Sequence, residues 1–152
     1  MELRTPLIIV ESDVIIKKDT IQNLLDIPGR YPKTGMAGAV TIDRDGNYNF
    51  PYNYIKKRNS EVEPTSHSLS FCCTLLTGEL LDVFNFDGLS ARKDWYDIYI
   101  SRRSKKLGFR NYLAKNTEVL HLPHSSRPWK QLKYSNPVKY YFQKYIKRRD
   151  RI

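Results

Sequence analysis

The sequence predicts an α/β domain, in which strands and helices follow one another along the chain. Leu7–Val10 is an apolar and largely β-branched run, as expected for a strand of a parallel sheet that is covered on both faces. Two more apolar runs, Met36–Ile42 and Ser70–Leu76, have the length of buried strands. Amphipathic segments separate these runs, and 152 residues suffice for one domain with a sizeable core.

The first helix is predicted over Lys18–Asp26. Asp19 suits its N-cap, and Pro28-Gly29 is expected to end it. The apolar face of this helix comprises Ile21, Leu24 and Leu25. This face predicts packing against the sheet.

A hairpin and a long loop are expected next. Asp45-Gly46 predicts a turn from the strand Met36–Ile42 into a partner at Asn47–Phe50. Tyr52–His67 is polar, charged in its middle and without periodicity, and therefore predicts a loop. Loops of this length are often lids or binding segments, and a plain surface excursion is the alternative.

The second half of the chain begins with the strand Ser70–Leu76, after which Thr77 can cap a short helix. The inward residues of that helix are Leu80, Leu81 and Phe84. Asn85–Gly88 predicts a turn, and a longer helix is expected over Lys93–Lys106 with Gly108 as its stop. Two short strands should follow, at Phe109–Leu113 and Thr117–Leu122.

The C-terminal segment gives the clearest helix pattern, with a basic amphipathic character. Asn136 suits an N-cap and Pro137 suits the first turn. Apolar residues recur with helical spacing at Val138, Tyr141, Phe142, Tyr145 and Ile146. Such a helix can lie on an anionic membrane surface, and packing of its apolar face on the protein's own core is the alternative.

The charge of the chain is concentrated in this tail. Residues 127–152 hold nine of the 26 basic residues and one of the 16 acidic residues, so they carry +8 of the formal +10. A nearly neutral body with a basic tail favours a surface-docking tail over a protein that wraps nucleic acid. A nucleic-acid-binding module remains an alternative, supported by the pI of about 9.6 and eleven tyrosines.

The two cysteines and the apolar runs predict a cytoplasmic protein. Cys72 and Cys73 are adjacent within a strand, so their side chains point to opposite faces and no disulfide between them is expected. They read as small core residues of a cytoplasmic protein. No apolar run reaches the ~18 residues of a membrane span, and the N-terminus has no signal-peptide pattern.

Two acidic residues follow the first strand. Glu11 and Asp13 stand where open α/β sheets bind ligands, at the carboxyl end of a strand. Paired carboxylates there suit a hard cation such as Mn²⁺ or Mg²⁺, which can hold a phosphate. The alternative is that they begin a solvated turn or cap the next helix.

In order, these segments resemble the second half of a family-2 glycosyltransferase of the GT-A type. The resemblance covers about Leu7 to Ser126 and rests on the order and spacing of short motifs rather than on any single motif. The matching stretches are Ile8–Val14, Asp19–Leu25, Ser70–Cys73, Asn85–Gly88, Asp94–Ile98, Leu107-Gly108 and Val119–His121. It implies a partial GT-A mixed sheet flanked by helices over residues 1–126, followed by the basic tail helix over 127–152.

The resemblance also implies a reaction and a set of site residues. A nucleotide-diphospho-sugar would donate its sugar to a hydroxyl of a glycan or lipid-linked acceptor, with inversion. Glu11, Asp13 and His121 would hold Mn²⁺ or Mg²⁺, and Asp94 or Asp97 would act as the base. The acceptor pocket would include Asp87 and Trp95. Each of these residues has a structural alternative: backbone-bonded His121, a helix cap at Asp94, an arginine pair at Asp97, an Asx-turn at Asp87 and a core position for Trp95.

The chain departs from the family pattern in several places. Glu11 replaces the first Asp of the metal motif, and Cys72 or Cys73 stands where the family often has Gly. A zinc site of His121, His124 and the cysteine pair is disfavoured, because the chain has no Cys-x-x-Cys pair. The nucleotide-gripping first half of the family has no counterpart.

The missing half leaves the activity open. A shortened enzyme, a non-catalytic remnant and a chain completed by a homo-oligomer or another chain are all compatible with the pattern. The expected location is cytoplasmic, with peripheral attachment to the inner face of the cytoplasmic membrane through the tail.

Overall fold

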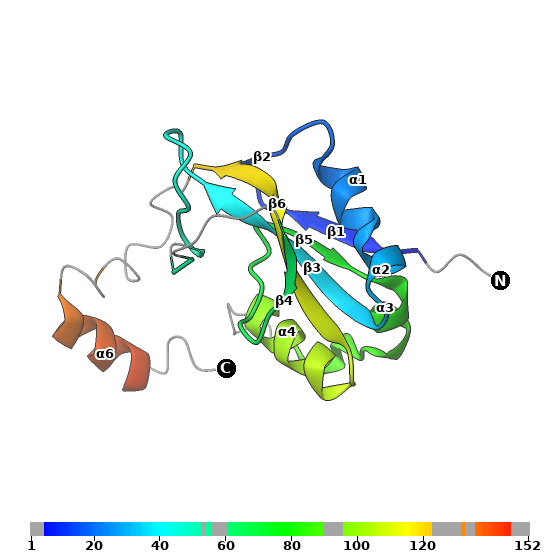
Figure 1. Cartoon of the computed structure of the whole chain (residues 1–152). Coiled ribbons are helices and arrows are strands. Elements are labelled where there is room, and N and C mark those ends of the chain that lie inside the picture. The colour runs from blue at the N-terminus through cyan, green and yellow to red at the C-terminus, as the bar shows by residue number, and fades with distance from the viewer. Residues whose placement is uncertain are drawn as a thin grey trace.

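The computed structural model describes residues 5–52, 54–55, 61–89, 96–122, 132 and 136–146, and these form a mixed sheet flanked by helices (Figure 1). The predicted α/β class is confirmed at this level. The strands are β1 (Leu7–Val10), β2 (Val14–Ile15), β3 (Thr34–Ile42), β4 (Val62–Pro64), β5 (Cys73–Leu76) and β6 (Arg110–His121). The helices are α1 (Thr20–Leu25), α2 (Ile27–Arg30), α3 (Gly78–Val83), the 3-10 turn η1 (Phe86–Gly88), α4 (Tyr96–Lys106) and α6 (Pro137–Tyr145).

The sheet has the order β1-β5-β3-β6-β2, and β4 also pairs with β6. Only β3 and β6 are parallel, whereas the other pairs are antiparallel. The expectation of a buried parallel strand at Leu7–Val10 is wrong, because β1 is an edge strand that is antiparallel to β5 and leaves Leu7 and Val10 exposed. An apolar run predicts a strand but does not tell an edge from a centre.

Helices cover both faces of the sheet (Figure 1). On one face α1 and α2 place Leu24 and Ile27 against alanines of β3 and against Leu75 of β5. On the other face α3 and α4 place Leu80 and Ile100 against Met36 and its neighbours. The predicted strand Met36–Ile42 is therefore the buried centre of the domain, as β3.

The two short strands expected after Gly108 are one long strand, β6. Its register with β3 jumps from Ala39↔Ala114 to Val40↔Glu118, so the intervening residues of β6 bulge out. The polar residues of that bulge look like a loop in the sequence, which explains the wrong boundary. Different neighbours pair with its two halves, β4 before the bulge and β2 after it.

The loop expected over Tyr52–His67 contains β4, so this part of the expectation is wrong. A polar strand that ends in Pro64 is tolerated because β4 lies at a sheet edge and pairs on one side. The predicted turn at Asp45-Gly46 is confirmed, since Gly46 has φ of 80°. Its hairpin partner shrinks to one bridge between Ile42 and Tyr48.

Several predicted helix ends are confirmed. The Thr77 hydroxyl accepts from the Leu80 amide at 3.3 Å, the Asn136 side chain accepts from the Lys139 amide at 3.0 Å, and Gly108 has φ of 86°. Asp19 stands at the N-cap of α1 without a side-chain cap bond. Pro28 does not end the helical region as expected, because it lies in the first turn of α2.

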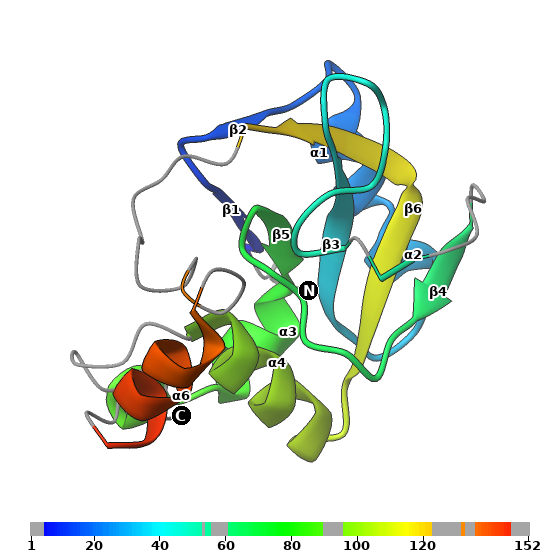
Figure 2. The same ribbon diagram turned by 90° about the vertical axis from the view of Figure 1, so that its left-hand side faces the viewer.

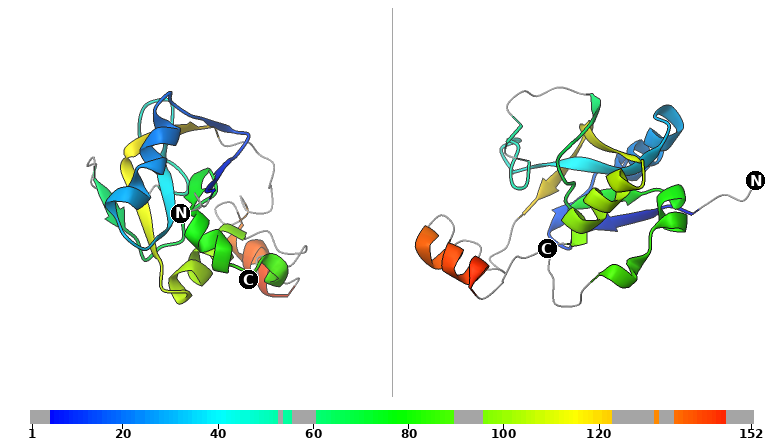
Figure 3. Two further views of the ribbon diagram at one scale, coloured as in Figure 1. Left: turned by 90° about the vertical axis from the view of Figure 1, so that its right-hand side faces the viewer. Right: turned by 90° about the horizontal axis from the view of Figure 1, so that it is seen from below.

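The tail helix α6 stands to one side of the sheet and its helices (Figures 1 and 3). Its predicted apolar face is exposed, with Val138 80%, Phe142 55% and Ile146 67% accessible, while Tyr140 on another side is buried. The expected alternative in which this face packs on the core is not what the described residues show. Within the described part of the chain, no helix is long and apolar enough to cross a membrane.

The sheet curls so that its two outer strands approach each other at one end. β1 and β2 stand at opposite ends of the strand order, yet only Glu11, Ser12 and Asp13 connect them. Figure 2 shows this connection passing over the end of the sheet. The curl brings strand ends together that a flat sheet would hold apart.

Candidate metal centre

The carboxyl ends of β1 and β6 meet at this end of the sheet. These two strands run in the same direction, because β1 is antiparallel to β5, β5 is antiparallel to β3, and β3 is parallel to β6. Glu11 follows β1, Asp13 precedes β2, and His121 is the last residue of β6. The three predicted metal ligands therefore arrive at one place from separate strand ends.

His121 and Asp13 face each other across the β2–β6 pair. The register places Val14 opposite His121, and the Leu122 amide donates to the Asp13 carbonyl at 2.9 Å. His121 Nε2 lies 3.5 Å from Asp13 Oδ2, and the His121 side chain is only 4% exposed. This strand pairing holds the two side chains in place independently of any ion.

The orientation of the His121 ring is set by a backbone carbonyl. His121 Nδ1 lies 2.7 Å from the Phe50 carbonyl oxygen, which can only accept, so Nδ1 carries the hydrogen. In the neutral imidazole the lone pair is then on Nε2, the atom that faces Asp13. A backbone hydrogen bond on the far nitrogen is the usual support of a metal-binding histidine. The backbone hydrogen bond that was the structural alternative for His121 is therefore also compatible with a role as metal ligand.

Cys72 joins this group from the start of β5. The register Val10↔Cys73 sets the strands side by side, and the Glu11 amide donates to the Cys72 carbonyl at 3.1 Å. The Cys72 thiol is 3.3 Å from Glu11 Oε2 and donates to it, and the Ser70 hydroxyl lies 3.2 Å from the sulfur. Cys72 is buried as predicted, but it is more than a small core residue.

The environment keeps the Cys72 thiol protonated in the metal-free protein. Burial is the main cause that raises the pKa of this thiol; the Ser70 hydroxyl bond opposes it, and the Glu11 carboxylate adds to it. Burial also raises the pKa of Cys73 to about 11. A cation that binds sulfur at Cys72 must therefore displace a proton.

The donor set fits a transition-metal dication better than Mg²⁺. Ligand atoms of Glu11, Cys72 and His121 lie within 4.8 Å of one another, and Glu11 opens the group to solvent. Mg²⁺ prefers oxygen ligands in an octahedron, whereas nitrogen and sulfur donors suit later metals. Asn49 donates to the His121 carbonyl at 3.0 Å, and its buried Oδ1 has no hydrogen-bond partner among the described residues.

Of the other predicted site residues, the structure describes Asp97 and Asp87. Asp97 lies in the first turn of α4, where its Oδ1 accepts from the Ile98 amide at 2.8 Å. Asp87 is exposed on η1, and the Asn85 side chain accepts from its amide at 2.7 Å, so this turn is an Asx-turn as the alternative expected. Asp94, Trp95 and His124 lie outside the described residues.

Tyr52 connects Asp97 electrostatically to the metal-ligand group. Burial is the main cause that raises the pKa of the Tyr52 hydroxyl, the bond from the Ser70 amide opposes it, and Cys72, Tyr54 and Asp97 add to it. Asp97 and Cys72 thus act on one buried hydroxyl. Helix α4, which carries Asp97, packs on the same face of the sheet as Tyr52, since Ile100 and Tyr52 belong to one cluster.

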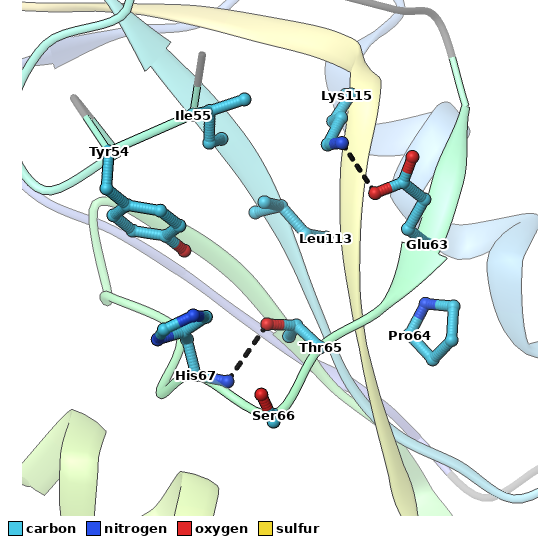
Figure 4. Close-up of a pocket in the computed structure, with 9 residues that line it drawn as sticks. All are labelled: Tyr54, Ile55, Glu63, Pro64, Thr65, Ser66, His67, Leu113 and Lys115. Atoms are coloured by element: carbon cyan, nitrogen blue, oxygen red, sulfur yellow. Dashed lines mark hydrogen bonds and ion pairs between the residues drawn. The ribbon is translucent and has the colours of Figure 1, made fainter. Parts of the chain in front are cut away.

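A cavity of about 310 Å³ lies beside β4 (Figure 4). The rings of Tyr54 and His67 lie 4.8 Å apart on one side of it, and the Lys115–Glu63 ion pair lies on the other. The described part of the segment Tyr52–His67 thus lines this pocket. None of the predicted site residues that the structure describes lines it.

Cys72 is the site residue that the sequence analysis missed. The signal was present, since the cysteine pair stands where the resembled family often has Gly, but only the β1–β5 register shows which cysteine meets Glu11. The chain matches no protein-family model, and no curated protein matches it significantly. What the centre does must therefore be argued from its own chemistry.

Proposed function

We propose that this chain is a GT-A type glycosyltransferase domain that moves a sugar, with inversion, from a nucleotide-diphospho-sugar to a hydroxyl of a glycan or lipid-linked acceptor. One observation carries the proposal: of the three residues that the resemblance names as ligands, Glu11 and His121 share one group of ligand atoms, and Asp13 Oδ2 lies 3.5 Å from His121 Nε2. The mixed sheet flanked by helices is compatible with the GT-A type.

Glu11, Asp13 and His121 would hold a divalent cation. When bound, the cation would supply a Lewis acid that stabilises the negative charge on the departing diphosphate. The chain's own part is to pre-orient the ligands. The Phe50 carbonyl fixes the His121 ring, and the β2–β6 pairing fixes Asp13, so little ordering is left to do at binding.

Asp97 is the described candidate for the base. An inverting transfer needs a carboxylate that takes the proton of the attacking hydroxyl. Asp97 lies in the first turn of α4, and this helix packs on the face of the sheet that carries Tyr52, which supports a position on the side of the metal centre. Asp94 is the second candidate for this role, and Asp87 and Trp95 remain candidates for the acceptor pocket.

The tail helix supports a membrane-bound acceptor. The exposed residues Tyr141, Phe142 and Tyr145 are the amphipathic aromatics that suit a headgroup region, and Lys139 and Lys144 lie on the same helix. The concentration of positive charge in residues 127–152 complements an anionic bilayer. We therefore place the domain on the inner face of the cytoplasmic membrane.

The second candidate is a remnant that folds but binds no donor, or a domain that another chain completes. The outer edge of β1 favours completion, since among the described residues β1 pairs only with β5 and exposes Leu7 and Val10. Exposed strand edges pair readily with further strands. A second copy or another chain could extend the sheet next to Glu11.

Calorimetry tests the proposed function. The chain is titrated with a panel of nucleotide-diphospho-sugars in the presence of Mn²⁺, and we expect one donor to bind in a metal-dependent way. Asp13→Asn should weaken this binding at least about tenfold, because it removes a charged ligand. Asp82→Asn is the matched control, since Asp82 is exposed on α3, beyond the far end of β5. A chain that binds the cation but none of the donors is the remnant.

A further inference from the structure

The Cys72 sulfur bears on a question that the proposed function leaves open, namely which metal the centre takes. Side chains of Glu11, Cys72 and His121 meet here, and one of them is a buried thiol. Cys72 Sγ lies beside Glu11 Oε2, and Asp13 Oδ2 adjoins the group through His121 Nε2. The resemblance implied only oxygen and imidazole ligands.

We propose that Cys72 is a metal ligand and that the centre selects Zn²⁺, or another thiophilic dication, over Mg²⁺ and Mn²⁺. The inference rests on the proposed function only for what the bound metal does. Its test measures metal binding directly. As the sulfur–metal bond forms, the thiol proton leaves for bulk water. The net charge of the ligand side chains is therefore lower by one than with the protonated thiol.

The spacing of the donors suits a tetrahedral ion. With metal–ligand bonds of 2.0–2.3 Å, neighbouring ligand atoms of a tetrahedral zinc site lie roughly 3.3–3.8 Å apart. Cys72 Sγ and Glu11 Oε2 are 3.3 Å apart, and His121 Nε2 and Asp13 Oδ2 are 3.5 Å apart. The ligand atoms of Glu11, Cys72 and His121 lie within 4.8 Å of one another, and Asp13, which lies outside this group, would have to move toward it to complete a four-ligand shell.

The choice of metal follows from the donor types. Thiolate and imidazole ligands favour Zn²⁺ and related ions, whereas Mg²⁺ requires oxygen ligands in a near-ideal octahedron. The first-row series also places Mn²⁺ at the weak end and Zn²⁺ well above it for a given nitrogen, oxygen and sulfur set. Cys72 therefore strengthens the preference for Zn²⁺ over Mg²⁺ and Mn²⁺ that His121 already provides.

The neighbouring Cys73, the first residue of β5, provides a matched control. It is buried like Cys72, but it packs with Leu24 and Ile27 in the core beneath α1 and α2. Adjacent residues of a strand point to opposite faces, so Cys73 has no access to the metal centre. An ion that binds cysteine thiols without regard to the site would respond equally to substitution of Cys72 and of Cys73.

Cobalt is the probe, because a thiolate bound to Co²⁺ gives a charge-transfer absorption in the near ultraviolet. We expect this band for the wild-type chain and for Cys73→Ala, and its loss in Cys72→Ser and Cys72→Ala. Zn²⁺ should displace Co²⁺ at concentrations at least tenfold lower than Mn²⁺ requires. Circular dichroism checks that each variant is folded, and the two Cys72 variants guard against a loss of structure in one of them.

The outcomes separate this inference from the proposed function. A cobalt band that survives both Cys72 variants, or equal displacement by Zn²⁺ and Mn²⁺, overturns the inference and leaves the glycosyltransferase proposal standing. A chain that holds Zn²⁺ through Cys72 but binds none of the nucleotide-sugars overturns the glycosyltransferase proposal and leaves the zinc centre standing.

Discussion

Gly35 lies where α4 approaches the sheet closely. A Cβ at this position would lie 2.7 Å from the Phe109 Cβ and still closer to the Ser104 hydroxyl. Ser104 cannot retreat easily, because it is buried and its hydroxyl donates to Asn111 at 2.8 Å. The absence of a side chain at residue 35 is therefore a packing requirement of this helix–sheet contact.

We expect Gly35→Ala to lower the free energy of unfolding by about 1–3 kcal/mol, the usual cost of overpacking. Urea denaturation measures the change. Gly29→Ala is the matched control: nothing lies within 4 Å of a Cβ there, and in α2 alanine should be neutral or stabilising by about 0.5–1 kcal/mol. Equal midpoints for the two variants would contradict the close approach of α4.

Tyr52 predicts a loss of stability at alkaline pH. In the folded protein the pKa of its buried hydroxyl lies above the ordinary value of 10.0, chiefly because of burial. In the unfolded chain the hydroxyl ionises near pH 10, so the unfolded state releases a proton that the folded state keeps. The stability contributed by neutral Tyr52 is thus present below pH 10 and is lost as the pH rises above it.

The Tyr52→Phe variant tests this linkage. It should show a shallower fall of unfolding free energy between pH 9 and pH 11 than the wild type. Its stability at pH 7 should be lower by about 1 kcal/mol, because the Ser70 amide loses its acceptor. Tyr141→Phe, at an exposed position of α6, should leave the pH slope unchanged. Parallel slopes for wild type and Tyr52→Phe would show that Tyr52 ionises alike in both states.

At the residue scale, the sequence indicates much of the centre but not its most informative ligand. Glu11, Asp13 and His121 each adjoin a strand, and strand ends can be recognised from apolar runs. Cys72 acquires its role from the pairing of β1 with β5, which depends on tertiary structure. For the same reason, the sequence predicted burial for the cysteine pair and disfavoured a zinc site that included it.

At the element scale, boundaries fail where the sheet is irregular. β6 looks like two strands because its bulge holds polar residues, and β4 looks like loop because it is short and ends in Pro64. Helix ends that depend on local chemistry, such as the caps at Thr77 and Asn136, could be predicted. Long-range pairing, by contrast, leaves no local signal.

The helix α6 leads to a prediction on membranes. Burial of Phe142 and Ile146 in a headgroup region should contribute about 1.5–3 kcal/mol each, so the double variant Phe142→Ser/Ile146→Ser should lower partition into anionic vesicles at least about tenfold. Flotation with vesicles that contain phosphatidylglycerol measures this partition, and vesicles of phosphatidylcholine alone should bind weakly.

Ile15→Ser is the control for this experiment. Ile15 is exposed to 54%, similar to Ile146, but it lies on β2 and not on α6. It should partition like the wild type. Equal effects of both changes would indicate a general loss of hydrophobicity. Tight, steeply salt-dependent binding to duplex DNA without binding to vesicles would instead favour the nucleic-acid alternative.

At the scale of the whole molecule, the curl of the sheet follows from a short connection. A flat arrangement β1-β5-β3-β6-β2 would hold its outer strands about 19 Å apart, since neighbouring strands are spaced by 4.7–4.9 Å. The residues Glu11–Asp13 extend the chain from Val10 to Val14 by at most about 14 Å. The sheet must therefore bend, and this bend assembles the metal centre.

An ion bound there should stabilise the entire fold, because its ligands adjoin β1, β2, β5 and β6. At a free Zn²⁺ concentration of 100 times Kd, linkage gives about 2.7 kcal/mol, which raises Tm by roughly 5–11 °C for a chain of this size. His121→Ala should lower the metal-free Tm through its lost hydrogen bond to Phe50, and should also abolish the zinc-dependent shift. Scanning calorimetry with and without Zn²⁺ separates the two effects, with Asp82→Asn as the variant that keeps the shift. If His121→Ala gains as much from Zn²⁺ as the wild type does, the stabilising ion binds elsewhere, and the strand ends at residues 11–13 are held by the connection alone.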